Sequence, residues 1–278
     1  MIFAKTQEEF SCMVEILIEE LASIGLHVNG KKTKIMTNVS PSYNYLDISG
    51  ELVTVLGNNE THRYLGRLLC GDLSDRAATE IKNRLQNSWY KFSQHSRTLT
   101  NRNISIKLRL KLFDSVITPS ILFGLAALPV TQAYLDKVDA TQRKMMRKIV
   151  GWVRNPGEPW NITMQRMNDR VSNATNQYTI KSWSQQIFKA QWKYIQRLKS
   201  LPDNSWVLQS CQWVPTESRD GYAPKMPRRN AGHPQLRWHD NMNGFCRFHA
   251  NCTWQSMPDA QFNASMKAYM NYYGVHAI

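Results

Sequence analysis

Apolar side chains recur every three or four residues after Thr6, which is the spacing of an amphipathic helix. Thr6 and Glu9 together match the capping-box pattern, and Gly25 is placed to end the helix. Its outer face is acidic, so we expect it to pack against protein rather than contact phosphate. The recurring apolar positions are Phe10, Val14, Leu17, Leu21 and Ile24.

Short apolar or alternating runs on both sides of this helix indicate strands. The first run, Met1 to Lys5, has no preceding partner, which suggests a truncated domain. The later runs are separated by Pro41, Gly50 and Gly57, and a hairpin is expected near Gly50. These later strands are expected at 34–37, 46–48, 52–56 and 63–69.

From Ser74 onward the apolar period becomes that of helices, and strand signals vanish. Pro119 is expected to kink or interrupt one helix because its ring removes a backbone donor. The helices are expected at about 74–97, 104–127, 131–153, 177–200, 236–248 and 259–273. The pattern predicts an α+β fold, in which a small piece of mixed helix and antiparallel strands precedes a predominantly helical region.

Changes of pattern divide the chain into three expected parts. Residues 1–70 hold the first helix and the strands, and residues 71–155 form a helical domain. Residues 156–278 form a second helical region, with a basic loop at 214–235 that is rich in Pro, Arg and Gly.

The charge and the cysteines restrict the class of protein. The 278 residues carry 35 Lys and Arg against 21 Asp and Glu, a net charge of +14, which favours nucleic acid before an anionic membrane surface. Five cysteines fit a reducing interior. The opening apolar run is too short for a signal peptide, and no run approaches the ~18 apolar residues of a membrane span. We expect an intracellular, nuclear protein that is neither secreted nor bound to a membrane.

Two neighbouring helices carry the densest groups of cations. Like charges at i,i+4 repel unless an anion lies between them, so a positive stripe of this kind suits the backbone of a duplex. Such contacts do not read base sequence. An ordinary solvated helix face is the alternative. The cations are Lys107, Arg109 and Lys111 on one helix and Arg143, Lys144, Arg147 and Lys148 on the next.

A zinc site is one interpretation of the spacing Cys246-x-x-His249-x-x-Cys252. Thiolate and imidazole are zinc ligands, and a fourth ligand would complete a tetrahedron. The alternative is a partly buried helix, and no metal is assigned to the chain.

Several tryptophans raise base stacking as a further interpretation. Trp183 and Trp192 fall at helical spacing with Ile187 and Ile195, which favours core packing for these two. The others considered are Trp206, Trp213, Trp238 and Trp254.

Four segments, in order along the chain, resemble the reverse transcriptases of non-LTR (LINE-like) retrotransposons. The first resembles a segment of the family's palm, the second a strand near the primer grip, and the third a helix behind the thumb. The resemblance implies that residues 1–70 are the C-terminal piece of a palm and 71–155 a thumb-like domain. The segments are Gly25–Lys34, Tyr64-Leu65-Gly66, Gln142–Trp152 and Gly232–Asp240.

The chain departs from this family at the catalytic residues. The family holds two divalent metal ions on palm aspartates, two of them in a Tyr-x-Asp-Asp turn. No Asp-Asp pair occurs here, and the matching turn would lie immediately before Met1. The resemblance implies a piece that binds RNA and DNA as a template–primer duplex and has no cofactor of its own. Mg²⁺ and the missing N-terminal polymerase portion would belong to a complete homologue.

The resembling palm segment places Lys32 near an incoming triphosphate, and Lys31 and Lys34 flank it. Without the metal-binding turn, these lysines are expected to bind phosphate and not to catalyse. Two other functions stay open. One is a helical protein-interaction module with a structural zinc, and the other is an active polymerase whose N-terminal half lies outside this sequence.

Overall fold

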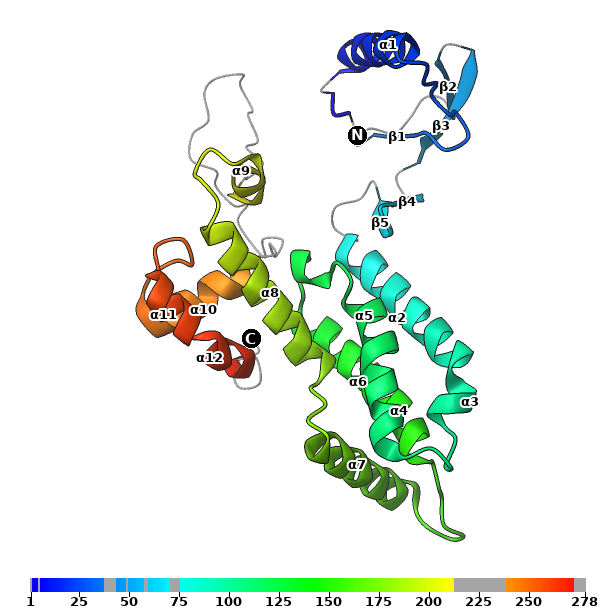
Figure 1. Cartoon of the computed structure of the whole chain (residues 1–278), viewed down its shortest axis with the longest axis vertical. Coiled ribbons are helices and arrows are strands. Elements are labelled where there is room, and N and C mark those ends of the chain that lie inside the picture. Colours follow the sequence, from blue (N-terminus) through cyan, green and yellow to red (C-terminus); the bar gives the residue numbers. More distant parts are fainter. Residues whose placement is uncertain are drawn as a thin grey trace. The chain divides into compact units, whose positions relative to one another are not determined.

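The chain forms two units, Met1–Glu80 and Ile81–Ile278 (Figure 1). The fold is α+β with a mainly helical C-terminal region, as predicted. The expected division into three parts stays a prediction. The basic loop 214–235 and nearly all of the segment Gly232–Asp240 lie outside the described residues. The computed structural model describes residues 2–4, 6–37, 44–48, 50–57, 60–70, 76–212 and 239–272.

The N-terminal unit contains helix α1 (Gln7–Ser23). The predicted cap is confirmed, because Thr6 Oγ1 accepts a hydrogen bond from Glu9 N at 3.2 Å. Gly25 follows the helix with a φ of 77°. No side chain of α1 is buried, so its apolar residues are half-buried or exposed. Residues 2–4 form no strand, contrary to the expectation, and no described strand pairs with them.

A three-stranded sheet follows in the order β1–β3–β2. Strand β2 (Tyr45–Ile48) pairs antiparallel with β3 (Glu51–Leu56), so the hairpin predicted at Gly50 is confirmed. Strand β1 (Lys34–Met36) pairs parallel with β3, whereas antiparallel strands were predicted. The sheet supplies most of the described buried apolar residues of the unit, namely Ile48, Val53, Val55 and Leu56, and Ala77 of the following helix is also buried.

A second, two-stranded sheet stands where a single strand at 63–69 was predicted. Strands β4 (Thr61–Tyr64) and β5 (Arg67–Cys70) pair antiparallel. Between them, Leu65 and Gly66 have φ values of 47° and 78°. Two successive positive φ values are what a tight type I′ hairpin requires. In the Tyr-Leu-Gly segment, Tyr64 therefore ends strand β4 and Leu65 and Gly66 form the turn, whereas a continuous strand was predicted.

The regular elements described in the C-terminal unit are all helices or helical turns, and this unit holds the large core. Helix α2 begins within the N-terminal unit, where Glu80 Oε2 accepts a hydrogen bond from Leu68 N at 2.8 Å. The elements are α2 (Arg76–Gln94), α3 (Ser96–Leu99), α4 (Ile106–Leu112), the π-helical η1 (Phe113–Ile117), α5 (Thr118–Leu122), the 3-10 turn η2 (Leu125–Ala127), α6 (Gln132–Val150), α7 (Trp160–Gln177), α8 (Trp183–Lys199), α9 (Trp206–Gln212), α10 (Asp240–Ala250), α11 (Asp259–Ala264) and α12 (Met266–Tyr272).

Helices α7 and α9 were not predicted from the sequence. Helix α7 buries only Thr163, Met167 and Val171, a stripe too thin to give a clear apolar period in an Asn- and Gln-rich segment. Helix α9 is two turns long. The helix expected at 177–200 begins later, because Ser182 Oγ accepts from Gln185 N at 3.2 Å and caps α8.

The interruption predicted at Pro119 is confirmed. Helix α4 passes into the π-helical η1 before this proline, which lies in the first turn of α5 where its missing N–H is not needed. By length and composition alone, Ile106–Ala127 could cross a membrane, although the sequence reading found no such run. Its residues Leu110, Phe113 and Ile117 are fully buried in the core, and the core helix of a folded domain passes the same test.

Helix α8 lies between α5 and α6 on one side and the group α10–α12 on the other (Figure 1). Trp192 stacks on Phe262 with ring centroids 3.9 Å apart. Trp183 stacks on Phe113 at 5.8 Å, and its Nε1 donates to Thr118 Oγ1 at 2.9 Å. The core packing favoured for Trp183 and Trp192 is confirmed.

Candidate nucleic-acid interface

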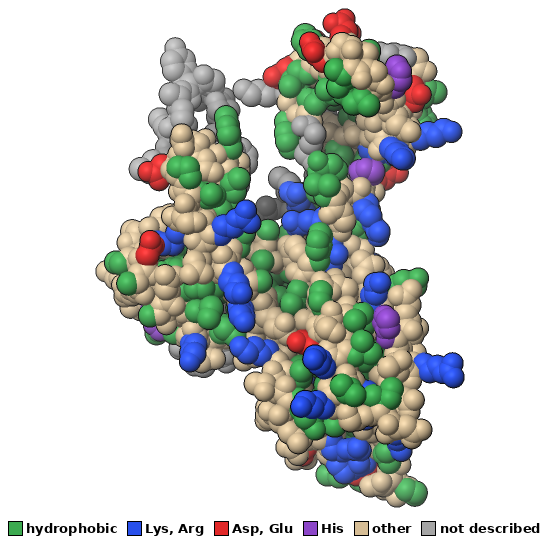
Figure 2. All heavy atoms as spheres, viewed as in Figure 1, with side chains coloured by type: hydrophobic (Ala, Val, Ile, Leu, Met, Phe, Trp, Pro, Cys, Tyr) green, Lys and Arg blue, Asp and Glu red, His purple; other side chains and the backbone are tan. Residues whose placement is uncertain are grey.

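Charge is divided unevenly between the two units. Residues 1–80 carry seven Lys and Arg against eleven Asp and Glu, a net charge of −4, whereas residues 81–278 carry 28 against ten, a net charge of +18. From Ile81 to Phe113 the sequence has eight cations and no carboxylate. In the view of Figure 2, Asp and Glu gather around α1, while Lys and Arg spread over the helical elements. The C-terminal unit is therefore the part that attracts a polyanion.

Helix α6 carries the densest group of cations on one face. Arg143, Lys144 and Lys148 are exposed and Arg147 is half-buried. All four lie on the side opposite the buried residues of the same helix, as the helical period requires. We refer to these four residues as the α6 cationic face.

Trp89 of α2 lies beside two members of the α6 cationic face. Its ring centroid is 5.9 Å from Lys144 Nζ and 5.2 Å from Lys148 Nζ, within the range of cation–π attraction. Neither lysine forms an ion pair within the described part of the chain. Sequence reasoning missed Trp89, because a tryptophan at helical spacing ordinarily indicates core packing. Here it places two exposed ammonium groups next to each other.

Arg147 joins the α6 cationic face to α7. Its Nη1 donates to Asn168 Oδ1 at 3.0 Å. Desolvation lowers the pKa of Arg147, and the neighbouring Arg143 guanidinium lowers it further. An arginine stays charged at neutral pH despite such a shift. The repulsion between the two guanidiniums therefore favours binding of an anion beside them.

The segment Gln142–Trp152 owes several of its residue types to packing. Gln142 is buried; its Oε1 accepts from Trp183 N at 2.9 Å, so it caps helix α8. Gly151 ends α6 with a φ of 89°, a conformation that L side chains rarely adopt. Within this segment, the exposed side chains are those of Arg143, Lys144, Lys148 and Trp152.

Arg109 does not belong to the candidate surface. Lys107 and Lys111 are exposed, but Arg109 is turned away from each of them by about 160° on the helix and is buried. Burial lowers the pKa of Arg109, and the nearby Arg102 contributes to the shift. Its guanidinium holds the C-terminal end of α6, where the helix dipole favours a cation. It donates to the backbone carbonyls of Leu99, Ile104 and Ile149.

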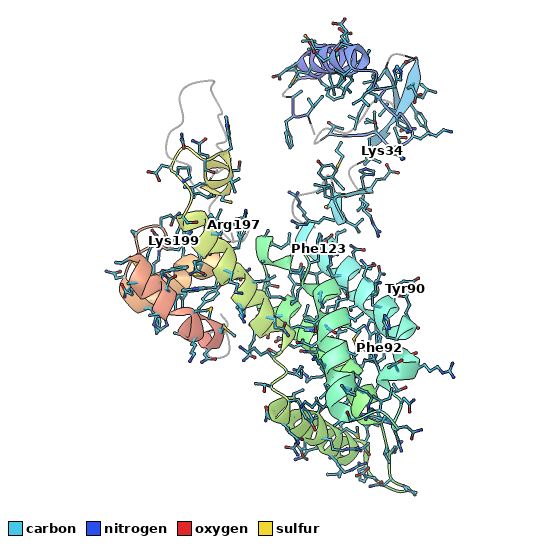
Figure 3. All side chains as sticks on the ribbon, viewed as in Figure 1. Lys34, Tyr90, Phe92, Phe123, Arg197 and Lys199 are labelled. Atoms are coloured by element: carbon cyan, nitrogen blue, oxygen red, sulfur yellow. The ribbon has the colours of Figure 1, made fainter. Side chains whose placement is uncertain are left out.

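The predicted lysines of the N-terminal unit lie on and after a fixed turn. Asn29 Oδ1 accepts from Lys32 N at 3.1 Å, and Lys31 and Lys32 are exposed. Lys34, labelled in Figure 3, donates from Nζ to Thr54 Oγ1 at 2.8 Å. These lysines and the α6 cationic face belong to different units, so they are separate candidates.

An exposed aromatic ring just after α5 contacts helix α2. The ring centroid of Phe123, labelled in Figure 3, lies 4.7 Å from Arg84 Cζ, as a cation–π pair.

No metal centre forms among the described residues, where no three His, Cys, Asp or Glu side chains could hold an ion. Cys246 is buried and its pKa is raised to about 12 by that burial, which disfavours the thiolate that zinc requires. His249 packs against the ring of Phe245 at 4.2 Å. The spacing of Cys246, His249 and Cys252 thus gives no zinc site. The described residues likewise hold no cluster of carboxylates that fits a two-metal Mg²⁺ site.

Comparison with known proteins gives one informative match. No protein-family model matches the chain, and no solved structure matches it. The chain is 25% identical over 240 residues to a Caenorhabditis elegans protein described as transposon-derived and uncharacterized. The match covers 84% of this chain and 77% of that protein. The similarity supports a transposon origin for the chain.

Proposed function

We propose that this chain is the nucleic-acid-binding C-terminal part of a non-LTR retrotransposon reverse transcriptase. Its helical unit grips the backbone of a template–primer duplex of RNA and DNA. The observation that carries the proposal is the α6 cationic face, where exposed cations lie beside Trp89 without ion-pair partners in the described chain. The order of the resembling segments and the similarity to a transposon-derived protein support the class.

The proposal assigns binding to this chain and not nucleotidyl transfer. The sequence has no Asp-Asp pair, and the described residues have no group that could hold a metal ion. Mg²⁺ and the catalytic aspartates are expected in a complete homologue. The expected intracellular, nuclear location belongs to the same proposal.

Phosphate contacts of this kind act through release of counterions from the nucleic acid. The logarithm of the binding constant falls with the logarithm of salt concentration, with a slope of about 0.9 per phosphate neutralised. Because phosphates are identical along a duplex, the contacts of Lys144 and Lys148 would set affinity without reading sequence.

The test is duplex binding across a salt series with wild type and a Lys144→Gln, Lys148→Gln double variant. We expect binding by the wild type, and a slope shallower by about two in the variant because two phosphate contacts are lost. A Lys193→Gln, Lys267→Gln double variant is the matched control, since it removes two exposed charges from α8 and α12.

Two results would contradict the proposal. One is binding that does not respond to salt, or no binding. The other is a control double variant whose slope falls as much as that of the α6 pair, because net charge rather than a defined surface would then explain the affinity.

A further inference from the structure

The connection between α6 and α7 exposes two tryptophans that core packing does not explain. Trp152 is 38% exposed and Trp160 is 58% exposed. Their ring centroids lie 5.6 Å apart with the planes inclined at 46°. The adjacent Val153 and Ile162 are exposed as well, so large apolar side chains cluster on a short stretch of surface. Exposed clusters of this kind mark binding surfaces.

Glu158 holds this connection in one shape. Its carboxylate accepts hydrogen bonds from Arg166 Nη2 at 2.7 Å and from Thr163 Oγ1 at 2.7 Å. Arg166 Nη2 also donates to the carbonyl of Val153 at 2.9 Å, which ties the residue after Trp152 to helix α7. A surface whose rings are held by such contacts loses less conformational entropy on binding.

Of three exposed arginines in this region, one lies near the ring of Trp160 and two lie against the backbone just before Trp152. Arg154 Cζ is 6.0 Å from the ring centroid of Trp160, at the outer limit of cation–π attraction. Arg170 Nη2 donates to the carbonyl of Val150 at 3.0 Å, and Arg102 Nη2 lies 3.4 Å from where a Cβ on Gly151 would stand. None of the three forms an ion pair within the described residues. Glu158, the one acidic residue of 151–168, is used by Arg166.

We propose that Trp152, Trp160 and the neighbouring arginines form a binding site for an unpaired nucleotide of a single-stranded segment. One indole stacks on the base, and the guanidiniums contact the phosphates beside it. Indole faces stack on any base, and guanidinium geometry matches phosphate. An apolar peptide would cover the rings but leave the cations without a counter-charge, so charge complementarity favours nucleic acid.

This inference rests on the proposed function but uses a different surface from the α6 cationic face. The probes are a blunt duplex, the same duplex with an unpaired extension of about six nucleotides, and the same extension without bases. The last two carry equal phosphate charge, so the ratio of their affinities isolates stacking. Binding of the blunt duplex reports on the proposed function.

We expect the wild type to bind the base-bearing extension more tightly than the abasic one. Trp160→Ala should reduce that preference by about fivefold or more, because one stacked base is lost. It should leave the blunt-duplex affinity unchanged. Trp160→Phe should retain most of the preference, which keeps the test decisive if the alanine variant unfolds. Thermal unfolding of each variant reports on the fold.

Trp206→Ala is the matched control, because Trp206 is 83% exposed on α9 and lies outside this cluster. Its preference for the base-bearing over the abasic extension should equal that of the wild type. The inference is overturned by a wild type that does not distinguish the two extensions, by a preference that survives Trp160→Ala, or by an equal loss in the Trp206→Ala variant. If Trp160→Ala still prefers the base-bearing extension, a protein partner becomes the better explanation for the exposed rings. A blunt duplex that fails to bind overturns the proposed function instead.

Discussion

The two units of this chain differ in how far they bury their apolar side chains and in the sign of their net charge. In the N-terminal unit, helix α1 buries none of its side chains, and Met13, Ile16 and Leu17 are exposed. In the C-terminal unit, the core runs through α2 to α12 and encloses Trp183 and Trp192 almost completely. The first unit has a net charge of −4 and the second of +18.

The larger apolar core and the positive net charge therefore belong to the same unit. The C-terminal unit buries apolar side chains from α2 to α12, and its described cations other than Arg84 and Arg109 are half-buried or exposed. The N-terminal unit has a smaller core and a negative net charge. Its exposed Lys31 and Lys32 share the unit with the acidic face of α1, which repels phosphate, so they are weaker candidates than the α6 cationic face.

The largest expected effect is on stability, and it tests where the core lies. Trp192→Ala removes the ring that stacks on Phe262 and should lower the free energy of unfolding by about 3–5 kcal/mol. Leu17→Ala on α1 should cost about 1 kcal/mol or less, because Leu17 is already exposed. Urea denaturation followed by circular dichroism measures both. Equal losses would break the comparison between the units.

Periodicity predicted the elements that have thick apolar stripes and clear caps. Helices α1 and α6 were expected within a few residues of where they lie, and so were the end of α8 and the hairpin at Gly50, although α8 begins six residues later than expected. Local pattern could not give α7, since much of its support comes from elsewhere in the chain. Arg147 bonds to its Asn168, and its own Arg170 donates to the end of α6. Such contacts leave no period in the sequence.

The sequence indicated where the candidate surface lies but not which residues belong to it. The four cations predicted on α6 lie on one face of the helix, where three are exposed and Arg147 is half-buried, because four charges within six positions cannot all be buried. Arg109 was grouped with Lys107 and Lys111 by nearness in sequence, whereas its direction depends on the position of the α6 C-terminus. Trp152 and Trp160 were not predicted as binding residues, because exposure of a tryptophan has no local signature.

The next largest effect compares a buried cation with exposed cations of the same unit, by their unfolding free energy and their duplex affinity. Arg109→Met leaves carbonyls at the end of α6 without their charged donor, so we expect a loss of about 2–3 kcal/mol in unfolding free energy. Its duplex affinity should match that of the wild type. The Lys144→Gln, Lys148→Gln variant should show the reverse pattern, since exposed charges contribute little to stability. An Arg109→Met protein of normal stability and weakened binding would contradict the assignment.

The smallest expected effect is on the melting temperature. It depends on pH and compares one carboxylate from each unit. Hydrogen bonds from Arg166 and Thr163 lower the pKa of Glu158 from 4.5 to about 2, and desolvation opposes this shift. A lowered pKa means that the folded state favours the charged form. Glu158 therefore stabilises the fold fully above its ordinary pKa, and this contribution is lost as the pH falls through about 2. The melting temperature of the wild type should exceed that of Glu158→Gln at pH 7.

The two melting temperatures should converge as the pH is lowered from about 5 towards 2. Glu8 at the start of α1 is the matched carboxylate of the other unit. Its pKa is lowered by its own backbone N–H and by Thr6, without a guanidinium. Because α1 buries no side chain, Glu8→Gln should alter only local helix stability and leave the main transition in place. A difference for Glu158→Gln that persists at low pH would show that the side chain acts through packing and not through its charge.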